Sequence, residues 1–375
     1  MTKKIALISV HNDPNYGSML QAYALSAALS KLGYPNEYIE YNPYKEKNKI
    51  LNCGISLVKS VLSVFGIIKK TEYSYWHSKP FRKQRELFRE FHTAYIPSST
   101  RRYNINDIQV SNAEYAKFII GSDQTWSPLV TSSPNTLNFL GFVSDNSKKT
   151  AYAPSIGTTH ISPDYLPILK KHLSSFSSLS CREKQNAELL TTFLGKKVSH
   201  VLDPTFLLTK DDWQKLEEEI AVPPKFILCY ILGTKKCISD FAESLGREKG
   251  LPVLYIVTRP ESFIYDNILQ NVSVGQFLFL LNHATYVVTD SFHGSILSIN
   301  YGTNFYSFAK RETSNGFTDN DRIMDFLSII GLQNRFKTDS DSTYEEDIDF
   351  VKCHQILEPL RSKSVQYLSN LISKK

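Results

Sequence analysis

The sequence lacks the residue patterns of several common functional classes. Its five cysteines are scattered, odd in number and without CxxC spacing, which argues against a disulfide framework and a cysteine zinc site. It contains no GxGxxG dinucleotide fingerprint, no GxxxxGK[ST] phosphate loop, no GxSxG elbow and no HExxH metal motif. The sequence therefore predicts no metal site and none of these nucleotide or hydrolase sites.

Long apolar runs and an N-terminal leader are also missing. No apolar run approaches the roughly 20 residues that span a bilayer. Thr2, Lys3 and Lys4 lead directly into the strand-like segment IALISV, so no signal peptide is indicated. We therefore expect a cytoplasmic protein.

The net positive charge is modest and is concentrated in one segment. The net charge is +6, yet between Lys45 and Glu90 eleven Lys/Arg face four Asp/Glu. This segment contains the apolar, lysine-edged stretch Ile55–Lys70, which suggests a helix that lies on the inner face of a membrane. The alternative is a buried helix with solvated lysines. No nucleic-acid motif accompanies the charge, so we expect no nucleic-acid partner.

The length and the alternation of predicted elements indicate two α/β domains. A chain of 375 residues exceeds what one core normally supports. Strands alternate with helices in both halves, which predicts two Rossmann-like domains with parallel sheets facing a central cleft. We assign 1–200 to the N-terminal domain, with a basic insertion at about 45–90, 201–345 to the C-terminal domain, and 346–375 to a helix that packs back on the first domain.

The most informative stretch is ATYVVTDSFHGSILSINYGTNFYSFAK, residues 284–310. It predicts a buried strand followed at once by a helix, with His293 in the first helical turn. Helix N-termini attract anions, and Ser291 and Gly294 lie at this one. An imidazole with an ordinary pKa of about 6.5 can transfer protons near neutral pH. The alternative is that His293 has only a capping role.

Two cationic residues follow predicted strands. Arg182, in SLSCREKQN, could bind a carboxylate or phosphate through two nitrogens, or could simply pair with Glu183. Lys310, at the end of NFYSFAK, could neutralise a phosphate or be solvated. Both are candidates for an anion site at the carboxyl ends of strands.

Two polar loops could contact a sugar. In GSDQTWSP, Asp123 and Gln124 could bind hydroxyl groups and Trp126 could offer an apolar platform, although a turn and a core tryptophan would give the same letters. In NDPNYGSML, the candidate contacts to an anion or sugar are Asn15, Tyr16 and Ser18.

Taken together, six segments resemble the polysaccharide pyruvyl transferase family. In chain order they are NYGSMLQAYAL, IIGSDQTW, YAPSIG, CREKQNAELL, VLDPTFLL and VTDSFHGSILSINYGTNF. The resemblance covers most of the chain. It implies a GT-B-like fold and the transfer of a pyruvyl group from phosphoenolpyruvate to a sugar of a bacterial surface glycan.

The resemblance also implies roles for the candidate residues. His293 corresponds to the functional histidine of the family, and Arg182, Lys310, Ser291 and Gly294 would bind the donor in the C-terminal half. Arg311 and Arg322 remain alternatives to Lys310. The acceptor would lie on the N-terminal side against Asn15, Tyr16, Ser18, Asp123, Gln124 and Trp126. Many members carry Gly–Asp where this chain has Gly17–Ser18, so the acceptor stays open.

The implied reaction builds a ketal on a capsule or exopolysaccharide precursor. Galactose 4,6-diol is the expected acceptor, either attached to a lipid carrier or soluble, and neither a metal nor an organic cofactor is expected. Membrane-surface contact through residues 55–70 would bring the enzyme to a lipid-linked substrate. The alternatives are a GT-B glycosyltransferase that uses a nucleotide sugar, and a non-catalytic glycan-assembly protein. Sequence specifies neither the ketal stereochemistry nor the oligomeric state.

Overall fold

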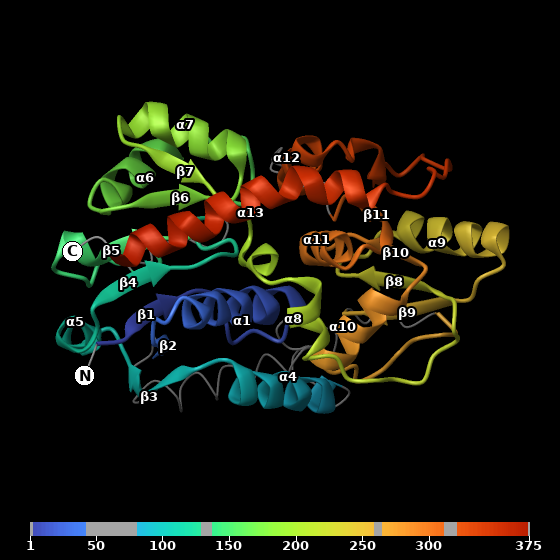
Figure 1. Cartoon of the computed structure of the whole chain (residues 1–375), viewed down its shortest axis with the longest axis horizontal. Helices are drawn as coiled ribbons and strands as arrows, with labels where there is room; N and C mark the ends of the chain where they lie inside the picture. The colour runs from blue at the N-terminus through green and yellow to red at the C-terminus, as the bar shows by residue number, and fades with distance from the viewer. Residues whose placement is uncertain (1–2, 43–80, 129–136, 259–264, 311–320, 374–375) are drawn as a thin grey trace, which may run out of the picture.

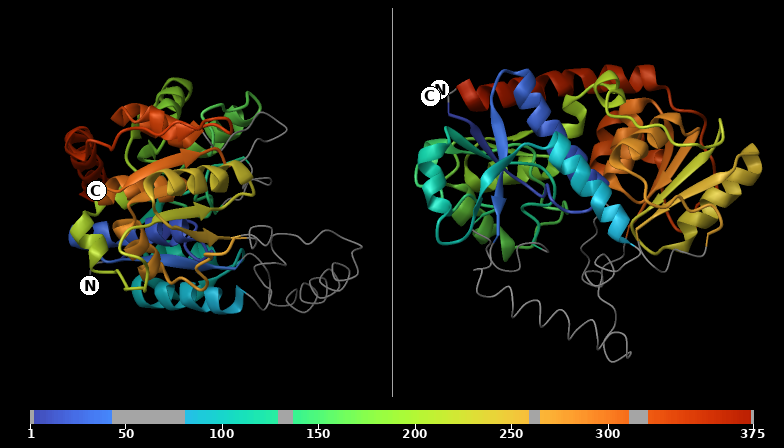
Figure 2. Two further views of the ribbon diagram at one scale, coloured as in Figure 1. Left: turned by 90° about the vertical axis from the view of Figure 1, so that its right-hand side faces the viewer. Right: turned by 90° about the horizontal axis from the view of Figure 1, so that it is seen from below.

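The computed structural model describes residues 3–42, 81–128, 137–258, 265–310 and 321–373. It shows two parallel β-sheets, one in each half of the chain, with helices packed on their faces (Figures 1 and 2). The predicted α/β fold with parallel sheets is confirmed. The predicted membrane-surface helix, Ile55–Lys70, lies outside the described residues.

The first sheet has the strand order β3-β2-β1-β4-β5. A bridge between Thr150 and Ser178 connects it to the parallel pair β6–β7. The strands are β1 (Ile5–Ile8), β2 (Asn36–Tyr41), β3 (Ser98–Tyr103), β4 (Lys117–Ile120), β5 (Lys149–Ala151), β6 (Leu179–Cys181) and β7 (Val198–His200). The helices of this half are α1 (Tyr16–Lys31), α4 (Arg82–Tyr95), α5 (Ser111–Glu114), α6 (Tyr165–Leu173) and α7 (Lys184–Leu194).

The second sheet has the order β12-β11-β10-β8-β9. Its strands are β8 (Ile227–Ile231), β9 (Val253–Val257), β10 (Tyr286–Thr289), β11 (Asn304–Phe308) and β12 (Phe336–Lys337). Its helices are α9 (Lys236–Lys249), α10 (Val274–His283), α11 (Phe292–Tyr301) and α12 (Asp321–Ile330). Strands β8, β9 and β10 are buried along their whole length, as expected for a parallel sheet covered on both faces.

Two connections join the halves. The 3₁₀ turn Pro204–Leu207 and α8 (Lys210–Gln214) lead from the first sheet to the second. The final helix, α13 (Phe350–Ser373), runs back along the first half (Figure 1). There the Ser364 hydroxyl accepts a hydrogen bond from the Leu202 amide at 3.0 Å, and the Tyr367 hydroxyl donates to the Ala151 carbonyl at 3.0 Å.

A shared apolar core also links the halves. Tyr16, in the first turn of α1, stacks on Phe277 of α10 with ring centroids 4.2 Å apart. The Tyr16 hydroxyl donates to the Val272 carbonyl at 2.8 Å. This packing brings the start of α1 against the second half. Among the described helices, none has the length and apolar character to cross a membrane.

Candidate functional site

The centre of the site is the turn between β10 and α11. Ser291 caps α11 by accepting a hydrogen bond from the Gly294 amide at 3.2 Å. The preceding Asp290 accepts from the amides of Leu232 and Gly233 at 2.7 and 2.6 Å, which fixes the turn against the end of β8. The predicted strand-to-helix turn, with His293 in the first helical turn, is confirmed.

His293 belongs to the second half but faces the first. Its Nε2 atom lies 3.6 Å from Oδ2 of Asp203. Its ring also packs directly on Gly17, because a Cβ atom at position 17 would lie 2.2 Å from the His293 Nδ1 atom. The glycine of the NYGS motif therefore leaves the space that the imidazole occupies.

Asp203 joins His293 to the cationic group of the first half. Its Oδ2 atom accepts from Nη1 of Arg182 at 2.7 Å and from the Ser122 hydroxyl at 3.1 Å. Its Oδ1 atom accepts from the Thr205 amide at 3.0 Å. Burial opposes ionisation of this carboxyl, but His293 and Arg182 outweigh it and lower its pKa well below 3.8. Asp203 is therefore ionised and accepts hydrogen bonds as a carboxylate.

Asp203, in the segment VLDPTFLL, is not among the candidate residues that the sequence indicates. The available signal was position: an acidic residue soon after β7, at the carboxyl end of a parallel strand, where ligand sites form.

Arg182 is buried, and two of its three side-chain nitrogens donate no hydrogen bond to a described residue. Its guanidinium lies 4.3 Å from the centre of the Phe292 ring, and its Nε atom lies 3.7 Å from Glu183. Among the described residues, no hydrogen-bond acceptor meets its Nε and Nη2 atoms. Buried donors without acceptors are costly, so these two nitrogens are suited to an oxyanion.

Arg322 is the second arginine at this ring. Its guanidinium lies 5.6 Å from the Phe292 centroid. The side-chain oxygen of Gln124, in the orientation that satisfies its neighbours, accepts from both terminal nitrogens of Arg322 at 2.9 and 3.0 Å. Arg322 and Arg182 line one small cavity together with Asp203. Of the cations left open by the sequence, Arg322 is thus placed beside Arg182, whereas Arg311 lies outside the described residues.

Lys310 lies close to the turn between β10 and α11, where it interacts with Asp290. It follows β11 and acts electrostatically on Asp290. Burial raises the pKa of Asp290, while hydrogen bonds from Leu232 and Gly233 and the charge of Lys310 oppose that rise. The structure therefore connects Lys310 to the start of α11 by way of Asp290.

Ser18 and Asp123 extend the polar centre. The Ser18 hydroxyl donates to Oδ2 of Asp123 at 2.8 Å, and Asn15 caps α1 by accepting from the Ser18 amide at 3.2 Å. Burial raises the pKa of Asp123, but the charges of His293 and Arg182 outweigh this and lower it. Asp123 has a left-handed backbone with φ of 72°. Asp123 thus connects the start of α1 electrostatically to His293.

Two predicted acceptor contacts are wrong. Trp126 is completely buried among core side chains, and its Nε1 atom donates to the Asn138 carbonyl at 3.2 Å. Tyr16 is buried in the core that joins the halves. Both aromatic residues follow polar residues that could bind a ligand, but their rings pack in the apolar core. Neither ring therefore presents a face to a sugar.

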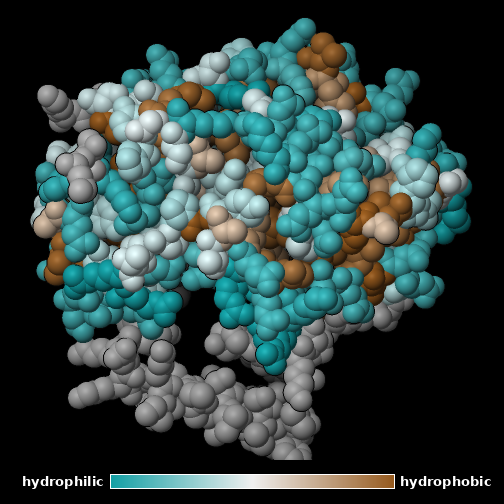
Figure 3. All heavy atoms as spheres, turned by 60° about the horizontal axis from the view of Figure 1, so that its bottom comes forward, coloured by the Kyte–Doolittle hydropathy of each residue, from teal (hydrophilic) through white to brown (hydrophobic). Residues whose placement is uncertain are grey.

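A pocket lies between the loop after β1 and helix α4. It has a volume of about 650 Å³, within the usual range for small-molecule sites. The face that carries α4 is mainly hydrophilic (Figure 3). The residues that line the pocket are Asn12, Asp13, Pro14, Met19, Arg82, Arg85, Glu86, Phe88 and Arg89.

Near His293, the buried charge of Arg182 is paired with Asp203. Side chains with the spacing of metal ligands occur elsewhere in the described part of the chain. They are His11, Glu40 and His92.

Comparisons with known proteins found a matching family model and similar solved structures. The family model described as polysaccharide pyruvyl transferase matches residues 15–310. A UDP-GlcNAc 2-epimerase from Methanocaldococcus jannaschii has a similar structure, with a TM-score of 0.53, 12% identity, and coverage of 95% of this chain and 92% of that chain. An S. aureus MnaA–UDP structure gives a TM-score of 0.46 and 13% identity, covering 100% and 99%. A search of curated proteins found no match. The M. jannaschii similarity supports a GT-B-like fold and no more than the fold.

Proposed function

Because this chain belongs to the polysaccharide pyruvyl transferase family, we propose that it transfers a pyruvyl group from phosphoenolpyruvate to a sugar as a ketal. The observation that carries this proposal is the buried network of His293, Asp203 and Arg182, built from both halves. It combines a proton carrier, a carboxylate that supports it and an anion anchor.

Phosphoenolpyruvate presents a carboxylate and a phosphate, and the site offers donors for both. The open nitrogens of Arg182 and the first turn of α11, from Ser291 to Gly294, are suited to one anionic group each. Arg322, on the same aromatic ring as Arg182, and Lys310, beside the same turn, add positive charge. A dianionic donor is thus a better match than a neutral one.

The proposed chemistry uses His293 as the proton carrier. Protonation of the methylene carbon of the donor leaves an oxocarbenium-like centre, which a sugar hydroxyl attacks. Phosphate leaves, and a second hydroxyl of the same sugar closes the ketal. His293 moves protons in this sequence or assists the departure of phosphate, while Asp203 orients the ring.

The acceptor side of the proposal combines Ser18 and Asp123 with the pocket beside α4. Ser18 and Asp123 can bind sugar hydroxyls next to His293. Arg82, Arg85 and Arg89 line the pocket and could bind the diphosphate of a lipid carrier. We therefore favour a lipid-linked galactose 4,6-diol of a capsule or exopolysaccharide precursor, with contact at the inner face of the membrane.

The decisive experiment measures phosphate release from phosphoenolpyruvate with and without a lipid-linked galactosyl acceptor. We expect acceptor-dependent release by the wild-type protein and a loss of on the order of 10²-fold or more in His293→Ala. The matched control is His283→Ala, which removes a histidine at the exposed end of α10. Near-normal turnover in folded His293→Ala would exclude the proposed role.

The same preparation tests the alternatives. The similar M. jannaschii structure is named as a UDP-GlcNAc 2-epimerase, so nucleotide sugars belong in the comparison. Thermal stabilisation by a nucleotide sugar and not by phosphoenolpyruvate would favour a glycosyltransferase. Stabilisation by phosphoenolpyruvate without phosphate release would support the donor and reject the acceptor. No response to either ligand would favour a non-catalytic role.

A further inference from the structure

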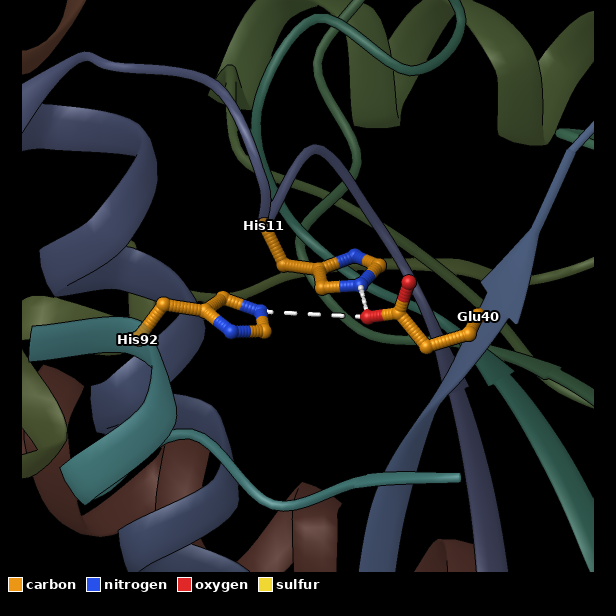
Figure 4. Close-up of side chains that lie close together, drawn as sticks. All are labelled: His11, Glu40 and His92. Carbon is orange, nitrogen blue, oxygen red and sulfur yellow. Dashed lines mark ion pairs between the residues drawn. The ribbon is translucent and has the colours of Figure 1, made fainter. Parts of the chain in front are cut away.

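Two histidines and a glutamate meet on the first half, outside the centre around His293. His11 lies in the loop after β1, Glu40 on β2 and His92 on α4 (Figure 4). Nε2 of His11 lies 3.4 Å from Oε1 of Glu40, and Nε2 of His92 lies 4.0 Å from the same oxygen. Both imidazoles therefore point toward one carboxylate oxygen from two different elements.

The hydrogen bond of the other ring nitrogen fixes the tautomer of His11. Its Nδ1 atom lies 2.9 Å from the Ser9 carbonyl oxygen, which can only accept, so Nδ1 carries the hydrogen. In the neutral ring, the lone pair is then on Nε2 and faces Glu40. A backbone carbonyl behind a histidine is the usual support of a metal-ligating imidazole.

The inward-facing nitrogens have no hydrogen bond that explains their burial. The Nε2 atoms of His11 and His92 are both buried without a partner among the described residues. A lone pair that faces a carboxylate is repelled unless a cation lies between them.

The distances are close to those of a tetrahedral site. Bonds of about 2.0–2.1 Å to zinc place tetrahedral ligand atoms about 3.3 Å apart. The His11–Glu40 distance of 3.4 Å already matches, and all three ligand atoms lie within 4.8 Å of one another. A small inward movement of His92 would complete the set. The second oxygen of Glu40 faces Arg102 at 3.8 Å, which leaves Oε1 as a single ligand.

We infer that His11, Glu40 and His92 form a binding site for Zn²⁺. Two imidazoles and one carboxylate suit zinc and leave the fourth position to water or another small ligand. The bound ion would tie the loop after β1 to β2 and α4. Within this loop, His11 is followed by Asn12 and Asp13 of the pocket, so the ion would stabilise one wall of that pocket. The inference does not depend on the proposed reaction.

The test is metal binding by the full-length chain, freed of metal with a chelator and carrying no affinity tag. Isothermal titration should show one Zn²⁺ per chain, and Co²⁺ should give the visible absorption of a tetrahedral site. Mg²⁺ should not bind here, because it prefers oxygen ligands and octahedral geometry. Zinc should also raise the melting temperature of the wild-type protein.

Three variants separate this site from adventitious binding. His92→Gln and Glu40→Gln should bind Zn²⁺ at least about 100-fold more weakly and lose the stabilisation by zinc. His160→Ala, which removes an exposed histidine in another loop, should bind as the wild type does. Circular dichroism establishes that each variant is folded. The inference is overturned if the wild type binds no zinc, or if folded His92→Gln and Glu40→Gln both bind it as tightly as the wild type.

Discussion

Among single side chains, Asp203 has the largest influence on the site. It is buried, and its two oxygens contact a histidine, an arginine, a serine and a backbone amide. Its pKa in the folded chain is lowered, so folding favours the ionised form. Its contribution to the free energy of unfolding is therefore complete above its unfolded pKa of about 3.9, and declines as the pH falls from there toward the folded value.

Asp203→Asn should remove this pH-dependent contribution. The substitution removes the carboxylate that buried Arg182 contacts at 2.7 Å, so we expect a loss of about 3–5 kcal/mol near pH 7. Urea unfolding of both proteins from pH 7 to pH 3 measures it. The difference should shrink below pH 4, where the wild-type carboxyl loses its advantage. Ser122→Ala, which removes one neutral donor to the same carboxylate, should cost less, and a pH-independent difference for Asp203→Asn would contradict the charged network.

Gly17→Ala should disable the site while leaving the chain folded. The added methyl group would lie 2.2 Å from the His293 ring, which must then move away from Asp203. Overpacking of this kind costs about 1–3 kcal/mol. We expect turnover to fall on the order of 10²-fold, as for loss of His293 itself. Phosphate release measures the effect, and the control is Gly33→Ala, just after the end of α1, where an added Cβ atom meets no atom within 4 Å. Equal activity of Gly17→Ala and wild type would contradict the observed contact.

At the scale of elements, the start of α11 matters because it holds both the histidine and a helix N-terminus. The sequence predicted this element well, since a buried apolar strand, a Ser cap and an apolar helix follow one another within a few residues. It could not show whether Trp126 packs in the core or forms a platform for a sugar, because an aromatic residue after a polar turn is compatible with both. Nor could it connect His11, Glu40 and His92, which lie on separate elements and meet only when the sheet forms.

Two serine caps allow the function of α11 to be separated from its stability. Ser291 caps α11 and Ser273 caps α10 in the same way, accepting from the amides of Gly294 and Gln276 at 3.2 and 3.0 Å. Ser291→Ala and Ser273→Ala should each cost about 1 kcal/mol in unfolding free energy. Only Ser291→Ala should weaken phosphoenolpyruvate binding, measured by thermal shift or calorimetry. Similar donor affinities of the two variants would argue against an anion site at α11.

Over the whole molecule, the predicted return of the C-terminal helix to the first half has a structural basis. α13 contributes Leu368 and Leu371 to the shared core, and Arg361 donates to the Phe206 carbonyl at 2.7 Å in the connection between the sheets. The helix runs from Phe350 to Ser373, within the predicted range 346–375. The edge strand β3 was not anticipated, because SSTRRY is polar and shows no regular apolar alternation.

Leu368→Ala should test how firmly α13 holds the halves together. Leu368 is completely buried, so its truncation should cost about 2–5 kcal/mol. The control is Val351→Ala on the same helix, which is 72% exposed and should change stability by less than about 0.5 kcal/mol. Chemical denaturation followed by tryptophan fluorescence and circular dichroism measures both. Equal stability of the two variants would mean that α13 contributes little to the fold.

Because of the contact between Gly17 and His293, the site is complete only when the two halves of the chain are together. The histidine comes from one half, while the glycine that receives it and the carboxylate that supports it come from the other. Any movement that parts the halves also withdraws His293 from Gly17 and Asp203. The proposed enzyme would therefore be inactive while its two halves are apart. Phosphoenolpyruvate would meet the assembled His293–Asp203 pair only after the halves have closed and excluded water.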